Sequence, residues 1–234
     1  MGKISLNRNQ IKYLVIIAMT IDHIAWAFVN TASVEGQLMH FIGRLTGPVM
    51  AYFITEGYIH TRNIKKYALR MGVFAIISWM PFSLFSEGAW PTAYMGVIYT
   101  LFLGLIAIWV WDKLGAPEWV KKLIVIGLCI ISIIGDWPIV DVLCPWLLFV
   151  YRDDEKKKWK VFWGVGILDI MLFGFGGYPL WTGIYNLGVF MAIALLQFCY
   201  SGKKGSNRPV HKWFFYVYYP AHLLILYLLK LLVA

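Results

Sequence analysis

The chain has 234 residues, of which 60% are hydrophobic and only 14% are charged, and its mean hydropathy is +0.68. Soluble domains carry about 25% charged residues, so this composition excludes an ordinary soluble domain and favours a protein of the lipid bilayer. The net charge of +9 lies in short loops between apolar runs, so it indicates orientation in a membrane rather than binding to nucleic acid.

Apolar segments separated by short loops run along the whole sequence. They predict an all-α, polytopic transmembrane helix bundle of about nine spans, built as a single integral membrane domain (1–234). The sixth segment is short and contains Pro145, so it is either a complete span or a half-helix. The predicted spans are 11–29, 38–59, 67–85, 93–111, 120–135, 139–151, 160–176, 183–200 and 213–233.

Lysine and arginine alternate from loop to loop. Basic residues precede the first span and lie between spans two and three, four and five, six and seven, and eight and nine. The intervening regions contain Glu35, Glu87, Asp136 and Asp141 and no Lys or Arg. Because short cytoplasmic loops concentrate positive charge, this pattern predicts a cytoplasmic N-terminus and a C-terminus outside.

Ionisable side chains also fall inside the predicted spans, where each costs several kcal/mol on insertion scales and usually faces a partner. A rise of about 1.5 Å per residue brings Asp22, His23 and Arg44 to similar heights in the outer half of the membrane. Neighbouring residues on a helix point about 100° apart, so Asp22 and His23 cannot form a same-face dyad. We expect Asp22 to pair with Arg44, which leaves the His23 imidazole to act as a general base. The other buried polar candidates are Glu56, Asp169 and His222.

Structural roles are alternatives for several of these residues. The Asp22–Arg44 pair could be only a tie between helices, His222 an interface histidine, and Asp169 the partner of a neighbouring hydroxyl. Two further histidines, His40 and His60, lie near span ends and are expected to be solvated.

Several motifs resemble one family of membrane proteins. Met19-Thr20-Ile21-Asp22-His23-Ile24 resembles the Met-x-x-Asp-His signature of the TraX family. Gly43-Arg44-Leu45, Pro48, Phe53-Ile54-Thr55-Glu56-Gly57-Tyr58 and His60-Thr61-Arg62-Asn63 resemble its second-span block. Tyr218-Tyr219-Pro220-Ala221-His222-Leu223 matches its final segment, so the resemblance covers about residues 10 to 230.

TraX proteins are pilin acetylases, and the resemblance implies a function for this chain. It implies a membrane acetyltransferase of the bacterial inner (plasma) membrane, with acetyl-CoA as acyl donor and without a metal. The acceptor would be an amine or hydroxyl, on a protein N-terminus or a glycan. We assign His23 as general base, with Asp22 and Arg44 completing the catalytic group; direct transfer and an acetyl-His23 intermediate both stay open. The candidate substrate-binding residues are Glu56, Tyr58, His60, Arg62, Asp169 and His222.

Two other classes of function fit a membrane protein with buried charges. A small-molecule or ion transporter also uses intramembrane charges, but the sequence shows no internal repeat and no matched pair of interrupted helices. A non-catalytic assembly factor for surface structures would need no base at His23.

Overall fold

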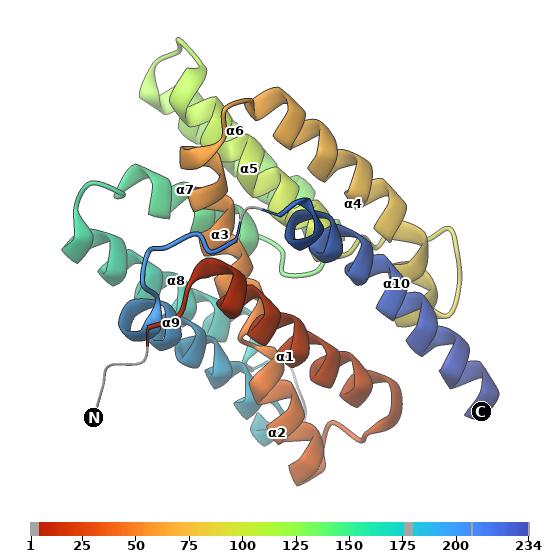
Figure 1. Cartoon of the computed structure of the whole chain (residues 1–234). Coiled ribbons are helices and arrows are strands. Elements are labelled where there is room, and N and C mark those ends of the chain that lie inside the picture. Colours follow the sequence, from red (N-terminus) through yellow and green to blue (C-terminus); the bar gives the residue numbers. More distant parts are fainter. Residues whose placement is uncertain (1–4, 176–179, 207, 234) are drawn as a thin grey trace. The chain divides into compact units, whose positions relative to one another are not determined.

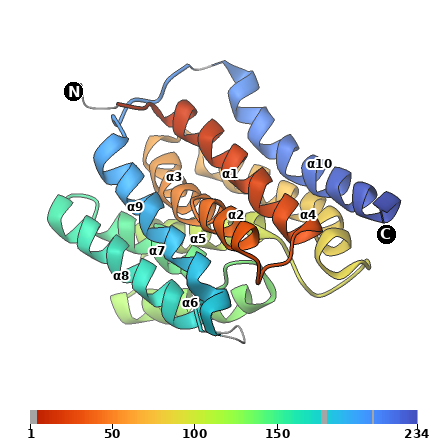
Figure 2. The ribbon, with the colours of Figure 1, turned by 90° about the horizontal axis from the view of Figure 1, so that it is seen from below.

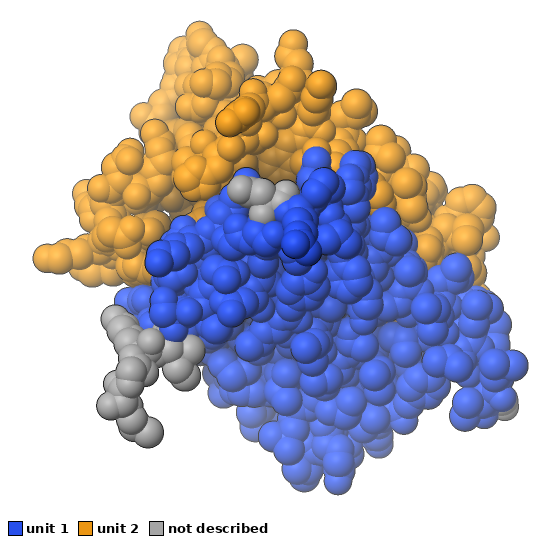
Figure 3. Space-filling model, viewed as in Figure 1, with its two compact units in different colours: residues 1–49, 166–234 blue, residues 50–165 orange. Residues whose placement is uncertain are grey.

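The computed structural model describes residues 5–175, 180–206 and 208–233, and all of its elements are helices. The all-α prediction is therefore confirmed for these residues. The last residue of the predicted span 160–176 lies outside them. The chain divides into two compact units, shown in two colours in Figure 3 and described one at a time below. Unit 1 is Met1–Val49 with Gly166–Ala234, and unit 2 is Met50–Val165.

Unit 1 joins the two ends of the chain. Its second helix packs against the first helix and against η2 and α9, and its last helix packs against the first (Figures 1 and 2). Its elements are α1 (Arg8–Phe28), α2 (Val34–Gly43), the first turn of α3 (Thr46–His60), the end of α8 (Glu155–Phe173), η2 (Leu180–Leu187), α9 (Gly188–Cys199) and α10 (Pro209–Val233).

Helices α1 and α10 lie side by side and run in the same direction (Figures 1 and 2). The Tyr13 hydroxyl and His211 Nδ1 are 2.7 Å apart near the start of both helices. Farther along, His23 and His222 are also in contact, so ten residues of α1 match eleven residues of α10. In this parallel register, the first turns of the two helices contact each other and their later turns contact each other.

The predicted span 38–59 is not one helix. The structure divides it into α2 and α3, with a turn at Arg44 and Leu45. Pro48 gives the physical reason, because a proline has no N–H for the carbonyl four residues earlier and its ring collides with that carbonyl. The residue four positions before Pro48 is Arg44. The break therefore puts an arginine at the discontinuity.

Unit 2 is arranged around α5 (Val97–Lys113), which packs against three other helices of the unit. A Cβ on Gly104 would lie 2.3 Å from the Asp141 carbonyl oxygen, so the missing side chain permits the close approach to α7. Thr100 donates to Asp141 Oδ2 at 2.8 Å in the same contact. The other elements that lie wholly in this unit are α4 (Ile64–Glu87), α6 (Glu118–Ile131), η1 (Ser132–Ile134) and α7 (Val140–Val150).

Four helices of the described chain are long and apolar enough to cross a membrane: α1, α4, the segment Trp181–Cys199 and α10. They identify a membrane protein. Helix α7 has 11 residues and is about 16 Å long, which is shorter than the hydrocarbon layer of a bilayer. A complete crossing by the segment 139–151 therefore needs the residues on either side of the helix, whereas a half-helix does not.

Candidate functional site

Two histidines from the two ends of the chain meet inside unit 1. His222 Nε2 lies 3.1 Å from His23 Nδ1, and the ring centroids are 4.9 Å apart. His222 is buried on α10, whereas His23 on α1 is partly exposed. The sequence predicts each residue as a candidate separately, and the structure brings the two into contact.

The neighbouring backbone determines where the hydrogens of this pair lie. His222 Nδ1 is 2.9 Å from the Tyr218 carbonyl oxygen, and His23 Nδ1 is 2.9 Å from the Met19 carbonyl oxygen. Because a carbonyl only accepts, each Nδ1 of the neutral rings carries the hydrogen. His222 Nε2 is then an acceptor, and His23 Nδ1–H is shared between that atom and Met19. The lone pair of His23 is consequently on Nε2.

Side chains around the pair hold the two rings in place. The Tyr218 ring stacks on His222 with centroids 5.1 Å apart and an interplanar angle of 11°. Its hydroxyl lies 2.7 Å from Thr20 Oγ1, which donates to the Ile16 carbonyl. Because Thr20 uses its hydrogen on Ile16, Tyr218 is the donor to Thr20. The bond ties α10 to α1 one turn before the histidine contact.

A second polar cluster lies beside the pair, where α1 packs against α2. His40 Nδ1 donates to Asp22 Oδ1 at 2.7 Å, and His40 is 0% exposed. The prediction that His40 is solvated is therefore wrong: the hairpin of α1 and α2 buries it against the rings of Trp26 and Tyr185, with centroids 4.2 and 5.2 Å away. The sequence analysis missed this hydrogen bond to Asp22.

Arg44, the partner that the sequence predicts for Asp22, interacts with it electrostatically. The guanidinium lies 4.8 Å from the centre of the Tyr185 ring, and its charge also acts on Asp169 of α8. Asp169 is 2% exposed, and its Oδ2 has no hydrogen-bond partner within the described residues. The alternative that Asp169 hydrogen-bonds a hydroxyl is thus not seen at that oxygen.

Two irregular spans meet at this cluster. Helix α9 follows the 3-10 helix η2 at Gly188, where a Cβ would lie 2.1 Å from the Phe41 carbonyl oxygen on α2. The Gln37 amide donates to the Thr31 and Thr182 carbonyls at 2.7 and 2.9 Å and fastens α2 to η2. The break before α3 and the change from η2 to α9 are not predicted from the sequence, and nothing places them in matched positions of a repeat. Irregular backbone at membrane depth is tolerated where protein surrounds it or a cavity adjoins it.

The remaining candidates belong to unit 2. Tyr58 is buried, and its hydroxyl donates to Asp112 Oδ2 at 2.7 Å. His60 and Arg62 are exposed at the end of α3, and Glu56 is partly exposed. The prediction that His60 is solvated is therefore confirmed. The structure therefore gathers Asp22, His23 and Arg44 with Asp169 and His222 in unit 1, whereas these four residues form part of another unit.

Comparison with known proteins decides the family. The family model described as TraX protein matches residues 7–230. The chain belongs to the TraX family. It is also similar to a probable fimbrial assembly protein FimC, serogroup H1, of Dichelobacter nodosus, with 30% identity over 237 residues and 95% of each chain covered. No solved structure matches the chain. The TraX match spans both halves of unit 1, so it includes both histidines of the pair.

Proposed function

We propose that this TraX family protein is a membrane-embedded acetyltransferase that moves an acetyl group from cytosolic acetyl-CoA to an amine or hydroxyl acceptor. The observation that carries the proposal is the contact between His23 and His222 in the interior of a membrane protein. Ionisable side chains inside a membrane protein are costly, and histidine is the side chain best suited to move protons near neutral pH. A pair of this kind fits a reaction that must take a proton from its acceptor.

The tautomers derived above give each histidine a step in this reaction. The acceptor N–H or O–H gives its proton to His23 Nε2 while its N or O bonds to the thioester carbonyl carbon. His23 Nδ1–H passes into His222 Nε2, so the positive charge is spread over two rings. When the C–S bond breaks, the thiolate of coenzyme A takes the proton back, and both rings return to their starting state.

Arg44 supplies the positive charge that this chemistry requires. Its guanidinium is held by the Tyr185 ring and acts on the charges of Asp22 and Asp169. We propose that it stabilises the oxyanion that develops on the acetyl carbonyl. Asp22, fixed by its bond from His40, keeps the positive charge close to α1.

We further propose that the protein crosses the bacterial inner membrane nine times. Its N-terminus would lie in the cytoplasm and its C-terminus outside. The parallel direction of α1 and α10 supports this topology. The chain crosses the membrane in alternating directions, so two spans run parallel only if both are odd-numbered or both are even-numbered, as the first and ninth are. Nine spans meet this condition if the short helix α7 and its flanking residues together count as one crossing.

A second candidate function is a non-catalytic role in assembly of surface fibres. The relative from Dichelobacter nodosus is described as a probable fimbrial assembly protein, which favours this alternative. It predicts that the protein binds its surface-structure partner equally well with and without His23.

Transfer of a radiolabelled acetyl group separates the two functions. Purified protein in detergent receives acetyl-CoA and a set of model amines and hydroxyl acceptors, and labelled product is counted. We expect the wild type to transfer the label and His23→Ala to lose about 100-fold or more in rate. Glu87→Ala, at an exposed residue outside the candidate site, is the control for handling and folding. Equal transfer rates in the wild type and His23→Ala would exclude His23 as the base and favour the assembly role.

A further inference from the structure

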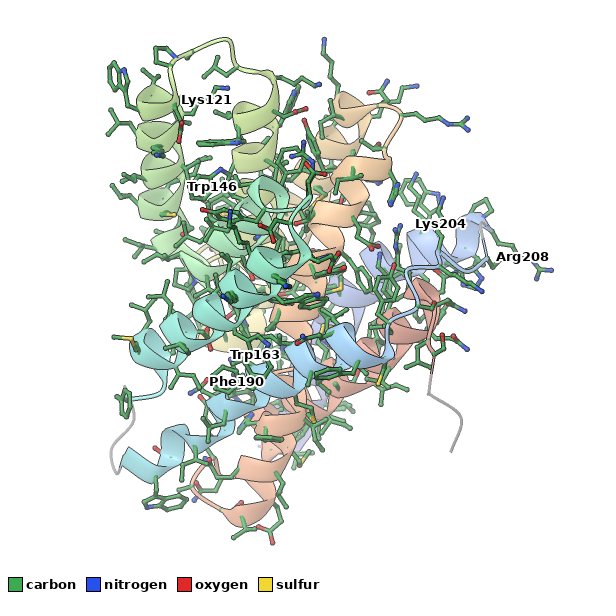
Figure 4. The ribbon with its side chains drawn as sticks, turned by 90° about the vertical axis from the view of Figure 1, so that its left-hand side faces the viewer. Lys121, Trp146, Trp163, Phe190, Lys204 and Arg208 are labelled. Carbon is green, nitrogen blue, oxygen red and sulfur yellow. The ribbon has the colours of Figure 1, made fainter. Side chains whose placement is uncertain are left out.

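Six basic residues gather where α1 and α10 begin. We call this surface the basic platform, and its described members are Arg8, Lys12, Lys203, Lys204, Arg208 and Lys212. Lys203, Lys204 and Arg208 are exposed, and Figure 4 labels Lys204 and Arg208 on the segment that leads into α10. Positive charge on short loops is common in membrane proteins, so the platform needs further features to indicate a ligand.

The backbone holds the platform together. The segment before α1 and the segment after α9 are joined by hydrogen bonds from Leu6 N to Cys199 O, Arg8 N to Lys203 O, and Ser201 N to Leu6 O, at 2.8 to 2.9 Å. Asn7 caps α1 reciprocally with Gln10, which fixes the first turn of the helix. These bonds fix the backbone at Arg8 and at Lys203, from which two of the six basic side chains extend.

The positive charge of the platform has no acidic neighbours along the sequence. The sequence has no Asp or Glu before Asp22 and none after Asp169, so both segments of the platform are free of acidic residues. In unit 2, Lys113 at the end of α5 lies 2.9 Å from Asp112, and Lys122 in α6 lies 2.8 Å from Glu118. The cations Arg62, Lys65 and Lys66 lie in a stretch, residues 57–86, that also contains no Asp or Glu. The basic platform therefore presents a stronger field to an anion than the paired lysines of α5 and α6 do. What distinguishes it from the Arg62 set is its connection to the histidine pair.

The platform is also joined to the histidine pair by the same two helices. From Arg8 to His23 is 15 residues along α1, or about 22 Å. A ligand that contacts both the basic platform and the histidine pair must be long. It must carry negative charge at one end and its reactive carbon at the other. Acetyl-CoA has this form, with phosphates on the nucleotide and the thioester at the far end of the pantetheine chain.

We propose that the basic platform binds the nucleotide phosphates of the acyl donor and that α1 and α10 lead the donor's arm to His23 and His222. This assignment rests on the proposed acetyltransferase function. It places phosphate recognition in unit 1, rather than on the exposed cations Arg62, Lys65 and Lys66 of unit 2. Charged side chains at a phosphate form strong hydrogen bonds, so their loss weakens donor binding without disturbing the chemistry.

The test compares three matched sets of glutamine variants, each at three exposed cations. The first is Lys203→Gln, Lys204→Gln and Arg208→Gln on the platform; the second is Arg62→Gln, Lys65→Gln and Lys66→Gln. The control is Lys156→Gln, Lys157→Gln and Lys160→Gln on α8. Binding of coenzyme A to the purified full chain is measured by titration calorimetry in nanodiscs of zwitterionic lipid, together with the KM for acetyl-CoA and kcat.

We expect the platform variant to weaken coenzyme A binding and raise KM by about tenfold or more, with kcat within about twofold of the wild type. The control should bind as the wild type does. Unchanged binding in the platform variant, or a loss confined to the Arg62 set, would overturn the assignment. If the wild type itself bound no coenzyme A, the proposed function would fail and the assignment with it. That result differs from unchanged binding in the platform variant, which would overturn the assignment alone.

A second arm separates the donor from membrane lipid, since anionic headgroups carry the same phosphate chemistry. The same proteins are titrated with vesicles that contain anionic lipid and no coenzyme A. Loss of vesicle binding in the platform variant, with coenzyme A binding intact, would identify a lipid anchor and contradict the proposal.

Discussion

The histidine pair shares one hydrogen between two rings, and this arrangement suits proton transfer. His23 Nδ1–H lies between an imidazole nitrogen and a backbone carbonyl, so a small change in charge at His23 Nε2 is enough to move it toward His222. Neither Asp22 nor any other carboxylate is needed for this step. In the proposed reaction, the pair would take the place that a histidine and an acid occupy in many acyl transfer enzymes.

Substitution of His222 tests whether its ring acts as an acceptor. Glutamine can place an oxygen near the position of Nε2 and accept from His23, whereas leucine cannot. We expect His222→Gln to retain several-fold more acetyl transfer than His222→Leu, because glutamine can still accept a hydrogen bond from the positively charged His23 ring that forms in the reaction, whereas leucine cannot. The measurement is the initial rate of label transfer by proteins of equal thermal stability. Equal rates in the two variants would show that the ring only fills space.

Substitution of His40 tests the Asp22 cluster. His40→Leu should lower the free energy of unfolding by about 1–3 kcal/mol, because it leaves the buried Asp22 carboxylate without its donor. His40→Asn keeps an N–H near the position of Nδ1 and should lose less. Thermal unfolding in detergent gives the comparison, with His60→Leu at an exposed position as control. A loss as large in His40→Asn as in His40→Leu would mean that ring packing, not the hydrogen bond, matters.

The sequence predicts the identity of the site residues better than their pairing. Ionisable residues inside apolar segments stand out because each is costly in a membrane, and this reasoning finds Asp22, His23 and His222. It does not find His40, since His40 lies in a helix whose register against α1 depends on the turn between them. A search for histidines within one hairpin of Asp22 would have found it.

At the scale of helices, close contacts at glycine hold the site together. A Cβ on Gly43 would lie 2.3 Å from the Asp22 Cβ, which leaves no room for any side chain. This contact brings α2 close enough to α1 for His40 to reach Asp22. The glycine therefore acts on the site although it has no chemistry of its own.

Alanine at Gly43 should destabilise the protein by about 1–3 kcal/mol and displace Asp22, because overpacked cores force side chains and backbone to shift. Gly127→Ala is the matched control: a Cβ at Gly127, within α6, has nothing within 4 Å. The control should be neutral or slightly stabilising, since alanine favours helices over glycine by up to about 1 kcal/mol. Thermal unfolding in detergent measures both. A Gly43→Ala protein as stable as Gly127→Ala would refute the role of the contact.

The sequence also predicts where the apolar helical segments lie better than it predicts where a helix is interrupted within them. Each predicted apolar segment contains a helix in the described chain, because hydrophobicity over a window is set by composition. The break before α3 depends instead on one proline acting four residues upstream, within a run that is apolar on both sides. No proline in the segment from η2 to α9 indicates the change from 3-10 helix to α-helix.

At the scale of the whole molecule, the topology makes a prediction that chemical labelling can check. After the three native cysteines are replaced by alanine, single cysteines are introduced at Ser201, in the loop before α10, and at Ser86, near the end of α4. An impermeant thiol reagent added to intact cells should label Ser86→Cys, and Ser201→Cys only after the cells are opened. Labelling of both from outside would contradict a nine-span protein with a cytoplasmic N-terminus.

The central claim is that His23 and His222 work as one unit in acetyl transfer. A double-mutant cycle measures this most directly, with single-turnover rates for the wild type, His23→Ala, His222→Ala and the double variant. Residues that act together are not additive, so the double variant should transfer acetyl at a rate within about threefold of His23→Ala alone. Losses that multiply, or a His23→Ala protein as fast as the wild type, would contradict the claim.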